Sequence, residues 1–176
     1  MSNALVGFEH KICDPAHAAR EAAALPRPIV FTNGVFDVLH RGHVTCLAEA
    51  RALGASLVVA LNSDGSVKRL GKGSDRPINP LADRLAVVAA LESTTLVTWF
   101  EADTPLELIL AIRPDVLVKG GDWAPDEIVG ADEVRAAGGS VHSIPFRFQR
   151  STSDLLERIR HSSPEHDVES TRRAPA

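Results

Sequence analysis

Five short apolar stretches alternate along the chain with segments in which apolar residues recur every three or four positions. Stretches of the first kind are typical of strands buried on both faces, and segments of the second kind are typical of helices with one buried side. The strand-like stretches are 28–32, 56–61, 95–100, 115–119 and 140–144. The alternation predicts an α/β fold, a Rossmann-like parallel five-stranded sheet with helices on both faces.

Turn and cap residues place the helices between these strands. The helical segments are 43–53, 80–91, 105–113, 126–137 and one that starts at 151. Gly54 is suited to end the first helix, and Asn79 followed by Pro80 is typical of a helix start. Residues 64–79 combine basic residues with glycines and predict a mobile loop, whereas the alanine-rich stretch 15–25 predicts a surface helix.

Length and composition fit one domain with polar ends. The chain has 176 residues, 44% of them hydrophobic, and it shows no internal repeat. We expect an N-terminal extension over 1–27, a folded domain over 28–161 and a disordered tail over 162–176. No apolar run approaches the roughly 18 residues of a membrane-spanning helix, and the first residues lack the pattern of a secretory signal. We therefore expect no membrane partner.

The cysteines and the charge balance indicate the compartment and the kind of ligand that the protein can bind. Cys13 and Cys46 form no CxxC pair, which predicts no disulfide and a cytoplasmic location. The formal net charge of -4 argues against coating of nucleic acid. The charge is uneven, because 99–133 holds nine acidic and two basic residues while 64–84 holds five basic and three acidic. A small polyanionic substrate is therefore compatible with this acidic chain.

The most informative stretch is FTNGVFDVLHRGH, residues 31–43, between the first strand and the first helix. His40 and His43 stand on either side of Gly42 at the predicted helix start. A helix N-terminus presents free N–H groups and positive partial charge, and a glycine there permits a phosphate to approach the backbone. Two imidazoles can also donate hydrogen bonds to phosphate oxygens. The stretch predicts phosphate chemistry at His40 and His43.

The two histidines also have other possible roles. A single histidine is more often structural than functional, and a pair three residues apart can bind a metal. No nearby cysteine or HExxH pattern supplies a third ligand, so we predict no protein metal site. The strand, glycine turn and helix around the pair favour the phosphate interpretation.

Polar residues at two later strand ends are candidates for contacts with a sugar. Asn62 and Asp64 follow the second strand and suit hydroxyl recognition, although ordinary turn chemistry explains them equally well. Gly121, Asp122 and Trp123 follow the fourth strand. Gly121 permits close approach of a ligand to the backbone, and Asp122 can accept hydrogen bonds from sugar hydroxyls. The ring of Trp123 can stack on a base or sugar, with core packing as its alternative role.

Two further segments are candidates for phosphate contacts. Lys72 lies between two glycines in the loop 64–79, and we expect it to swing over the site as a lid residue. Arg150, Ser151 and Thr152 stand at the start of the last predicted helix, where free N–H groups and two hydroxyls could form a second phosphate cradle. A simple helix cap is the alternative role for Ser151.

The stretch GVFDVLHRGH resembles the signature of the HxGH nucleotidyltransferases, which include the cytidylyltransferases and phosphopantetheine adenylyltransferase. The resemblance covers about residues 28–160. Within that family, LNSDGSVKRLGKGSDRPINPLADRLAVVAAL, DVLVKGGDW, EIVGADEV and RSTSDLLERI are similar to the heptose 1-phosphate adenylyltransferase branch.

This resemblance implies transfer of an adenylyl group from ATP, with Mg2+, to a sugar 1-phosphate in a homodimer. The attacking phosphate is already an anion, so the reaction needs positioning and charge stabilisation rather than a general base. The resemblance implies that Asn33, Gly34 and Val35 line the nucleotide and sugar-phosphate pocket. Phe36 is expected to pack the loop, and Asp37 either holds the loop through backbone N–H groups or touches the sugar.

The sequence is also compatible with three alternative functions. A CTP-dependent cytidylyltransferase acting on glycerol 3-phosphate would usually carry an RTEGISTT-type segment where this chain reads RFQRSTS, residues 147–153. A non-catalytic nucleotide-binding module is disfavoured because both motif histidines and the second cradle are present together. A fragment of an aminoacyl-tRNA synthetase is disfavoured because no KMSKS-like segment is present.

Overall fold

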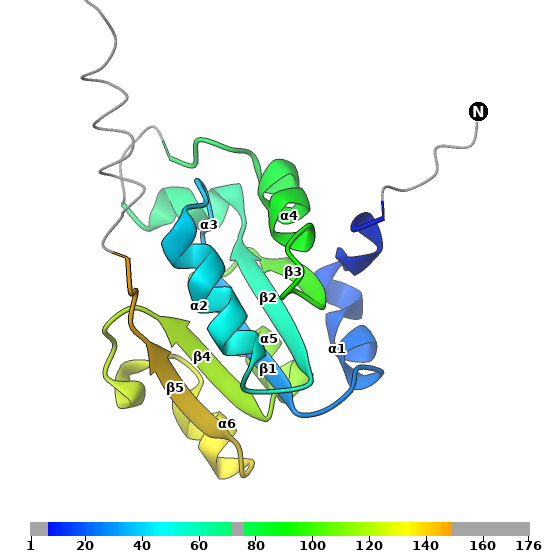
Figure 1. Ribbon diagram of the computed structural model, residues 1–176, viewed down its shortest axis with the longest axis vertical. Helices are drawn as coiled ribbons and strands as arrows, with labels where there is room; N and C mark the ends of the chain where they lie inside the picture. The colour runs from blue at the N-terminus through cyan, green and yellow to red at the C-terminus, as the bar shows by residue number, and fades with distance from the viewer. Residues whose placement is uncertain (1–6, 72–75, 149–176) are drawn as a thin grey trace, which may run out of the picture.

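A sheet of five parallel strands forms the centre of the molecule, in the order β3-β2-β1-β4-β5 (Figure 1). The strands are β1 (Ile29–Gly34), β2 (Ser56–Asn62), β3 (Leu96–Phe100), β4 (Val116–Gly120) and β5 (Ser140–Ile144). The computed structural model describes residues 7–71 and 76–148. The chain moves outward from β1 in one direction through β2 and β3, then returns to the other side of β1 through β4. This change of direction leaves a crevice at the carboxyl ends of β1 and β4.

Six α-helices and two short 3-10 helices are found in the described residues. The α-helices are α1 (Pro15–Ala23), α2 (Arg41–Arg51), α3 (Asp64–Arg69), α4 (Leu81–Ala89), α5 (Leu106–Ile112) and α6 (Ala131–Ala136). The 3-10 helices are η1 (Glu9–Lys11) and η2 (Pro125–Glu127). None of the described helices has the length and apolar character needed to cross a membrane.

The sheet is covered on both faces, because neighbouring residues of each strand point to opposite sides. Ile29 and Phe31 pack with α1, α5 and α6 on one face. Val30 packs with α2 and α4 on the other face. All seven residues of β2 are buried, as a central strand between two helical layers requires. These observations confirm the predicted Rossmann-like α/β class.

The segment 64–79 is not one loop, so that prediction is wrong at its start. Residues 64–69 form α3, which begins where the hydroxyl of Ser63 accepts a hydrogen bond from the N–H of Ser66, 3.0 Å away. Val67 is fully buried against the sheet. A local serine cap and one buried valine are enough to make this short helix, and neither stands out in a stretch rich in glycine and basic residues.

The predicted surface helix at 15–25 exists as α1, but it is part of the core. Ala18 and Ala22 have no exposed surface and pack in the same cluster as Ile109 and Ile112 of α5. Upstream of α1, the N–H of Cys13 donates to the carbonyl of Val97 on β3 at 2.8 Å. Small alanine side chains allow α1 to lie close to α5, which the alanine-rich sequence alone does not reveal.

Several helix ends differ from the predicted boundaries. The C-terminal cap residue of α2 is Ala52 rather than Gly54. The N-terminal cap residue of α4 is Pro80, and the side chain of Asn79 does not cap this helix. The predicted helix 126–137 is divided into η2 and α6, separated by Gly130 in the left-handed region at φ 87°. The last predicted helix, from 151, lies outside the described residues.

Candidate functional site

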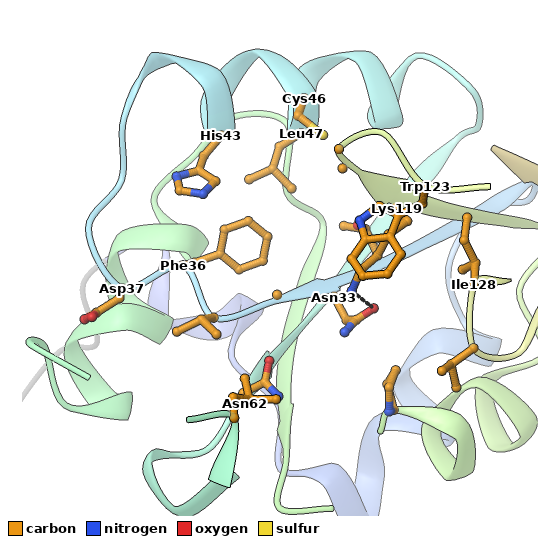
Figure 2. A pocket seen from close by; sticks show the side chains of 18 of the residues that line it. Asn33, Phe36, Asp37, His43, Cys46, Leu47, Asn62, Lys119, Trp123 and Ile128 are labelled. Carbon is orange, nitrogen blue, oxygen red and sulfur yellow. Dashed lines mark hydrogen bonds between the residues drawn. The ribbon is translucent and has the colours of Figure 1, made fainter. Parts of the chain in front are cut away.

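A cavity of about 650 Å³ opens at the carboxyl ends of three adjacent strands (Figure 2). Asn33 from β1, Asn62 from β2 and Lys119 from β4 all line it. Parallel strands end at the same edge of a sheet, so residues distant in sequence meet there. The cavity is the crevice expected from the strand order.

The motif histidines form one wall of this cavity. His40 is the residue before α2, and its Nδ1 accepts a hydrogen bond from the N–H of Gly42 at 3.1 Å. The rings of His40 and His43 are stacked, with centroids 3.9 Å apart and an interplanar angle of 22°. Because Nδ1 of His40 is an acceptor, the neutral ring carries its proton on Nε2. That N–H is then available to donate to an anion.

Burial keeps both imidazoles neutral near pH 7. Burial, reinforced by the neighbouring His40 ring, lowers the pKa of His43 to about 4. Burial also lowers the pKa of His40. The Nδ1 of His43 is buried and finds no hydrogen-bond partner in the described structure. The pair therefore offers neutral N–H donors to a substrate rather than a resident positive charge.

The structure explains the need for glycine at position 42 differently from the prediction. It does not line the cavity; it is buried beneath the His40 ring. A Cβ at this position would lie 3.0 Å from Cε1 and from Nδ1 of His40. The glycine therefore allows His40 to fold back over the start of α2.

Asp37 holds two separate segments together. Its carboxylate accepts hydrogen bonds from the N–H groups of Ile78 at 2.9 Å and Asn79 at 2.8 Å. Arg76 Nε lies 3.0 Å from Oδ2 of Asp37, as an ion pair without the alignment of a hydrogen bond. Figure 2 shows the carboxylate pointing away from Lys119 and Trp123. This is the loop-holding role expected for Asp37, and contact with a sugar stays a prediction.

Arg84 completes the same connection from α4. Its side chain has no exposed surface, and its guanidinium donates to the carbonyl of Val35 at 2.7 Å and of Asn79 at 3.1 Å. It also donates to Oδ1 of Asp64 at 2.7 Å. Arg84 fixes the backbone of the loop that carries the motif.

The opposite wall comes from β4 and the loop that follows it. Lys119 Nζ donates to Oδ1 of Asn33 at 3.2 Å and lies 5.8 Å from the ring centre of Trp123. Trp123 is 47% exposed, so core packing is excluded for it. Gly121 adopts φ 114°, and a Cβ there would lie 3.1 Å from the indole nitrogen of Trp123. Gly121 thus lets the chain turn so that the indole lies over the cavity.

The cavity brings together most of the residues singled out from the sequence. Those that line it are Asn33, Gly34, Val35, Asp37, His40, His43, Asn62, Gly121 and Trp123. Two predicted sugar contacts are not there: Asp64 binds Arg84 at the start of α3, and Asp122 is exposed outside the cavity. The predicted phosphate contacts Lys72, Arg150, Ser151 and Thr152 lie outside the described residues.

Two residues of this region were not selected from the sequence. Lys119 directly precedes the Gly-Gly pair at the end of β4, which could have identified it as a cavity residue. Arg84 lies on the apolar face of its helix with Leu85 and Val88, where a charged residue must be paired to be buried. Its place on the apolar face of the helix could therefore have identified Arg84 as a buried, paired residue.

A protein metal site is not apparent in the described residues. No group of three or more His, Cys, Asp or Glu side chains is arranged there to hold a metal ion. The carboxylate of Asp37 is already engaged by two backbone N–H groups and Arg76. These donors do not form an octahedral oxygen cage of the kind that holds Mg2+ without phosphate ligands.

The sequence matches a known family over most of its length. The model described as cytidylyltransferase-like matches residues 31–172. The chain belongs to the cytidylyltransferase-like family. The matched range contains every described residue that lines the cavity, from Thr32 to Phe146. The family assignment and the cavity therefore concern the same part of this cytidylyltransferase-like chain.

Two curated relatives are similar over most of the chain. The D-beta-D-heptose 1-phosphate adenylyltransferase of Bordetella bronchiseptica is 57% identical over 155 residues, which are 87% of this chain and 96% of the relative. The bifunctional protein HldE of Halorhodospira halophila is 54% identical over 143 residues, 81% of this chain. The matched part is 30% of that longer protein.

Solved structures agree with the fold. A lipopolysaccharide core biosynthesis protein from Thermoplasma volcanium aligns with a TM-score of 0.57 and 27% identity, over 69% of this chain and 98% of that one. A pantoate-beta-alanine ligase from Francisella tularensis aligns with a TM-score of 0.56 at 14% identity, over 81% of this chain and 68% of that one. The second likeness supports the fold alone.

Proposed function

We propose that this chain is an adenylyltransferase that joins ATP and D-glycero-D-manno-heptose 1-phosphate to give ADP-heptose and pyrophosphate, for lipopolysaccharide core biosynthesis. The observation that carries the proposal is the 57% identity to the heptose 1-phosphate adenylyltransferase, over 96% of that relative. An adenylyl donor is favoured over CTP for the same reason. The cavity offers neutral donors and a lysine, which suits two phosphorylated substrates.

In this reaction an oxygen of the sugar phosphate attacks the α-phosphorus of ATP, and pyrophosphate leaves. The nucleophile is already ionised, so no side chain has to remove a proton. His40 donates from Nε2–H to the triphosphate, and its Nδ1 is held by the N–H of Gly42 at 3.1 Å. His43, stacked on that ring, donates to the α-phosphate as negative charge develops there. Catalysis is then positioning together with charge stabilisation.

The remaining predicted contacts are assigned within the same proposal. Asn33 and the backbone of Gly34 and Val35 contact the nucleotide, while Asn62 and Trp123 contact the sugar. Lys72 and residues 150–152 add phosphate contacts from segments outside the described residues. Mg2+ would accompany ATP and would be held by the triphosphate oxygens, since the described residues form no cage for it. The enzyme works in the cytoplasm as a homodimer.

A panel of substrates tests the activity. Purified protein is incubated with ATP or CTP, each paired with heptose 1-phosphate or glycerol 3-phosphate, and pyrophosphate release is followed. We expect release only with ATP and heptose 1-phosphate, and a product with the mass of ADP-heptose. Unphosphorylated heptose serves as the control for the need for a phosphate nucleophile. Turnover only with CTP would overturn the proposal, and nucleotide binding without any turnover would favour a non-catalytic module.

A further inference from the structure

Lys119 occupies the wall of the cavity that faces the histidines. It belongs to β4, whereas His43 belongs to α2, and Figure 2 shows Lys119 beside Trp123 and separated from His43 by Leu47. The ammonium group donates to the neutral amide oxygen of Asn33 at 3.2 Å. The lysine is therefore aimed into the cavity at the carboxyl end of β4.

The loop after β4 is held in place by β5. The N–H of Gly121 donates to the carbonyl of Ile144 at 2.8 Å. The hydroxyl of Ser143 donates to the carbonyl of Gly121 and accepts from the N–H of Trp123, which is 3.1 Å away. These bonds fix the indole beside Lys119. A half-exposed aromatic face next to a cation suits a ligand that carries both a sugar and a phosphate.

The other cationic candidates in the described cavity wall supply little positive charge. His40 and His43 have lowered pKa values and are neutral near pH 7. The charge of Arg76 is balanced by Asp37 at 3.0 Å. Two acidic residues, Asp103 and Glu127, also line the cavity. A phosphate dianion entering this space needs a cation, and Lys119 is placed to provide it.

We propose that Lys119 binds the phosphate of the acceptor sugar and, through it, positions the attacking oxygen. The inference rests on the proposed function. In-line displacement requires the acceptor to approach the α-phosphorus from the side opposite the leaving pyrophosphate. With the triphosphate on the histidine wall, that side is the wall of Lys119 and Trp123. The hydrogen bond to Asn33 orients the ammonium group of Lys119 in the cavity. The incoming phosphate then accepts a hydrogen bond from this ammonium group, either in place of the amide oxygen of Asn33 or in addition to it.

The test measures the affinity for the acceptor with and without its phosphate. Wild type, Lys119→Met and Lys119→Gln are saturated with α,β-methylene-ATP, which cannot transfer its adenylyl group, and titrated calorimetrically with heptose 1-phosphate or with heptose. Lys119→Gln can still hydrogen-bond to Asn33 but has no charge, and it serves if the methionine variant fails to fold. Lys68→Met, which removes an exposed lysine of α3, is the matched control.

We expect both Lys119 variants to weaken heptose 1-phosphate binding about 10- to 100-fold, the effect of losing a charged hydrogen bond. Binding of heptose and of α,β-methylene-ATP should change less than about threefold by the same reasoning. The KM for heptose 1-phosphate should rise in parallel, and Lys119→Arg should restore part of the affinity. Lys68→Met should match wild type.

Three results would overturn the inference. Equal losses for heptose and heptose 1-phosphate would mean that Lys119 acts on the sugar or only on the fold. Weakened binding of the nucleotide analogue alone would assign Lys119 to ATP, and unchanged affinities would remove it from the site. Failure of the proposed function appears separately, because wild type would then not turn over heptose 1-phosphate with ATP. In that case the same comparison is made with whichever acceptor phosphate the wild type uses.

Discussion

His40 and His43 lie three residues apart, yet their surroundings give them different properties. His40 is partly exposed and its Nδ1 is held by the start of its own helix. His43 lies deeper, with its ring edge-to-face against Phe36 at 5.5 Å and against Phe146 at 5.9 Å. One ring is oriented by a backbone N–H group, and the other is oriented by packing. Both rings line the cavity in which the phosphates of the proposed reaction would lie.

Replacing His43 by Ala should reduce kcat at least about 100-fold, because one preorganised donor to the developing charge is lost. The rate of pyrophosphate release with saturating ATP and heptose 1-phosphate measures this effect. His17→Ala is the control, since His17 is exposed on α1. A His43→Ala enzyme that keeps wild-type kcat while remaining folded would remove His43 from the reaction.

The depressed pKa of His43 also predicts a dependence of stability on pH. The folded-state pKa of about 4 lies below the usual 6.5, so the unfolded chain binds more protons between these values. The free energy of unfolding should therefore fall as the pH is lowered from about 6.5 toward 4. Between pH 7.5 and 5 this residue should contribute a loss of about 1–2 kcal/mol.

Urea unfolding of wild type and His43→Gln at both pH values measures this contribution. The glutamine variant cannot take up the proton, so its stability should change less over the same range. Parallel pH dependences in the two proteins would show that His43 titrates normally in the folded state.

At the scale of elements, Arg84 and Asp37 connect the motif loop to the segment between α3 and α4. Arg84 holds the carbonyl of Val35, and Asp37 holds the N–H groups of Ile78 and Asn79. The two connections run in opposite directions between the same two segments. The position of the cavity wall therefore depends on contacts between residues 41 to 49 positions apart in the sequence.

Arg84→Met keeps much of the buried volume but leaves two carbonyls without their Arg84 donor and Asp64 without its ion-pair partner. We expect a loss of about 2–3 kcal/mol in the free energy of unfolding, with Asp64 partly rehydrated because it is half-exposed. Chemical denaturation gives the value. Asp83→Ala, at the neighbouring exposed position, should change stability by less than about 0.5 kcal/mol. Similar small effects for both variants would argue against the bridging role.

At the scale of the whole molecule, the sheet is closed on one face by helices from both ends of the described chain. α1 precedes the first strand, yet it packs beside α5 against the same face of the sheet. α2 and α4 cover the other face and carry the motif and Arg84. The helix that carries His43 and the α1 layer are thus on opposite sides of the sheet.

Ala18→Leu should overpack the contact between α1 and the core, because Ala18 has no exposed surface. We expect a loss of about 1–3 kcal/mol in the free energy of unfolding. Ala16→Leu, at an exposed position of the same helix, should be nearly neutral. Equal stabilities of the two variants in denaturant titrations would show that α1 contributes little to the folded core.

The order of strands and helices could be predicted from the sequence because it depends on local periodicity. Each of the five apolar stretches forms a strand, and no strand end differs from the prediction by more than two residues. The motif 31–43 also identified the correct edge of the sheet, since a strand followed by a glycine turn and a helix places these residues at a carboxyl end.

The sequence by itself thus determined the fold class, the parallel sheet and the location of the cavity at its carboxyl edge. Only the tertiary structure decided which polar residues at that edge face the cavity. Asp64 binds Arg84 and Asp122 is exposed, so neither faces the cavity, whereas Lys119 lines it and binds Asn33. Arg84 is buried and links two segments of the chain. The physical reason is that periodicity and caps are properties of neighbouring residues. The direction and burial of a polar side chain depend on partners that folding brings from distant parts of the chain.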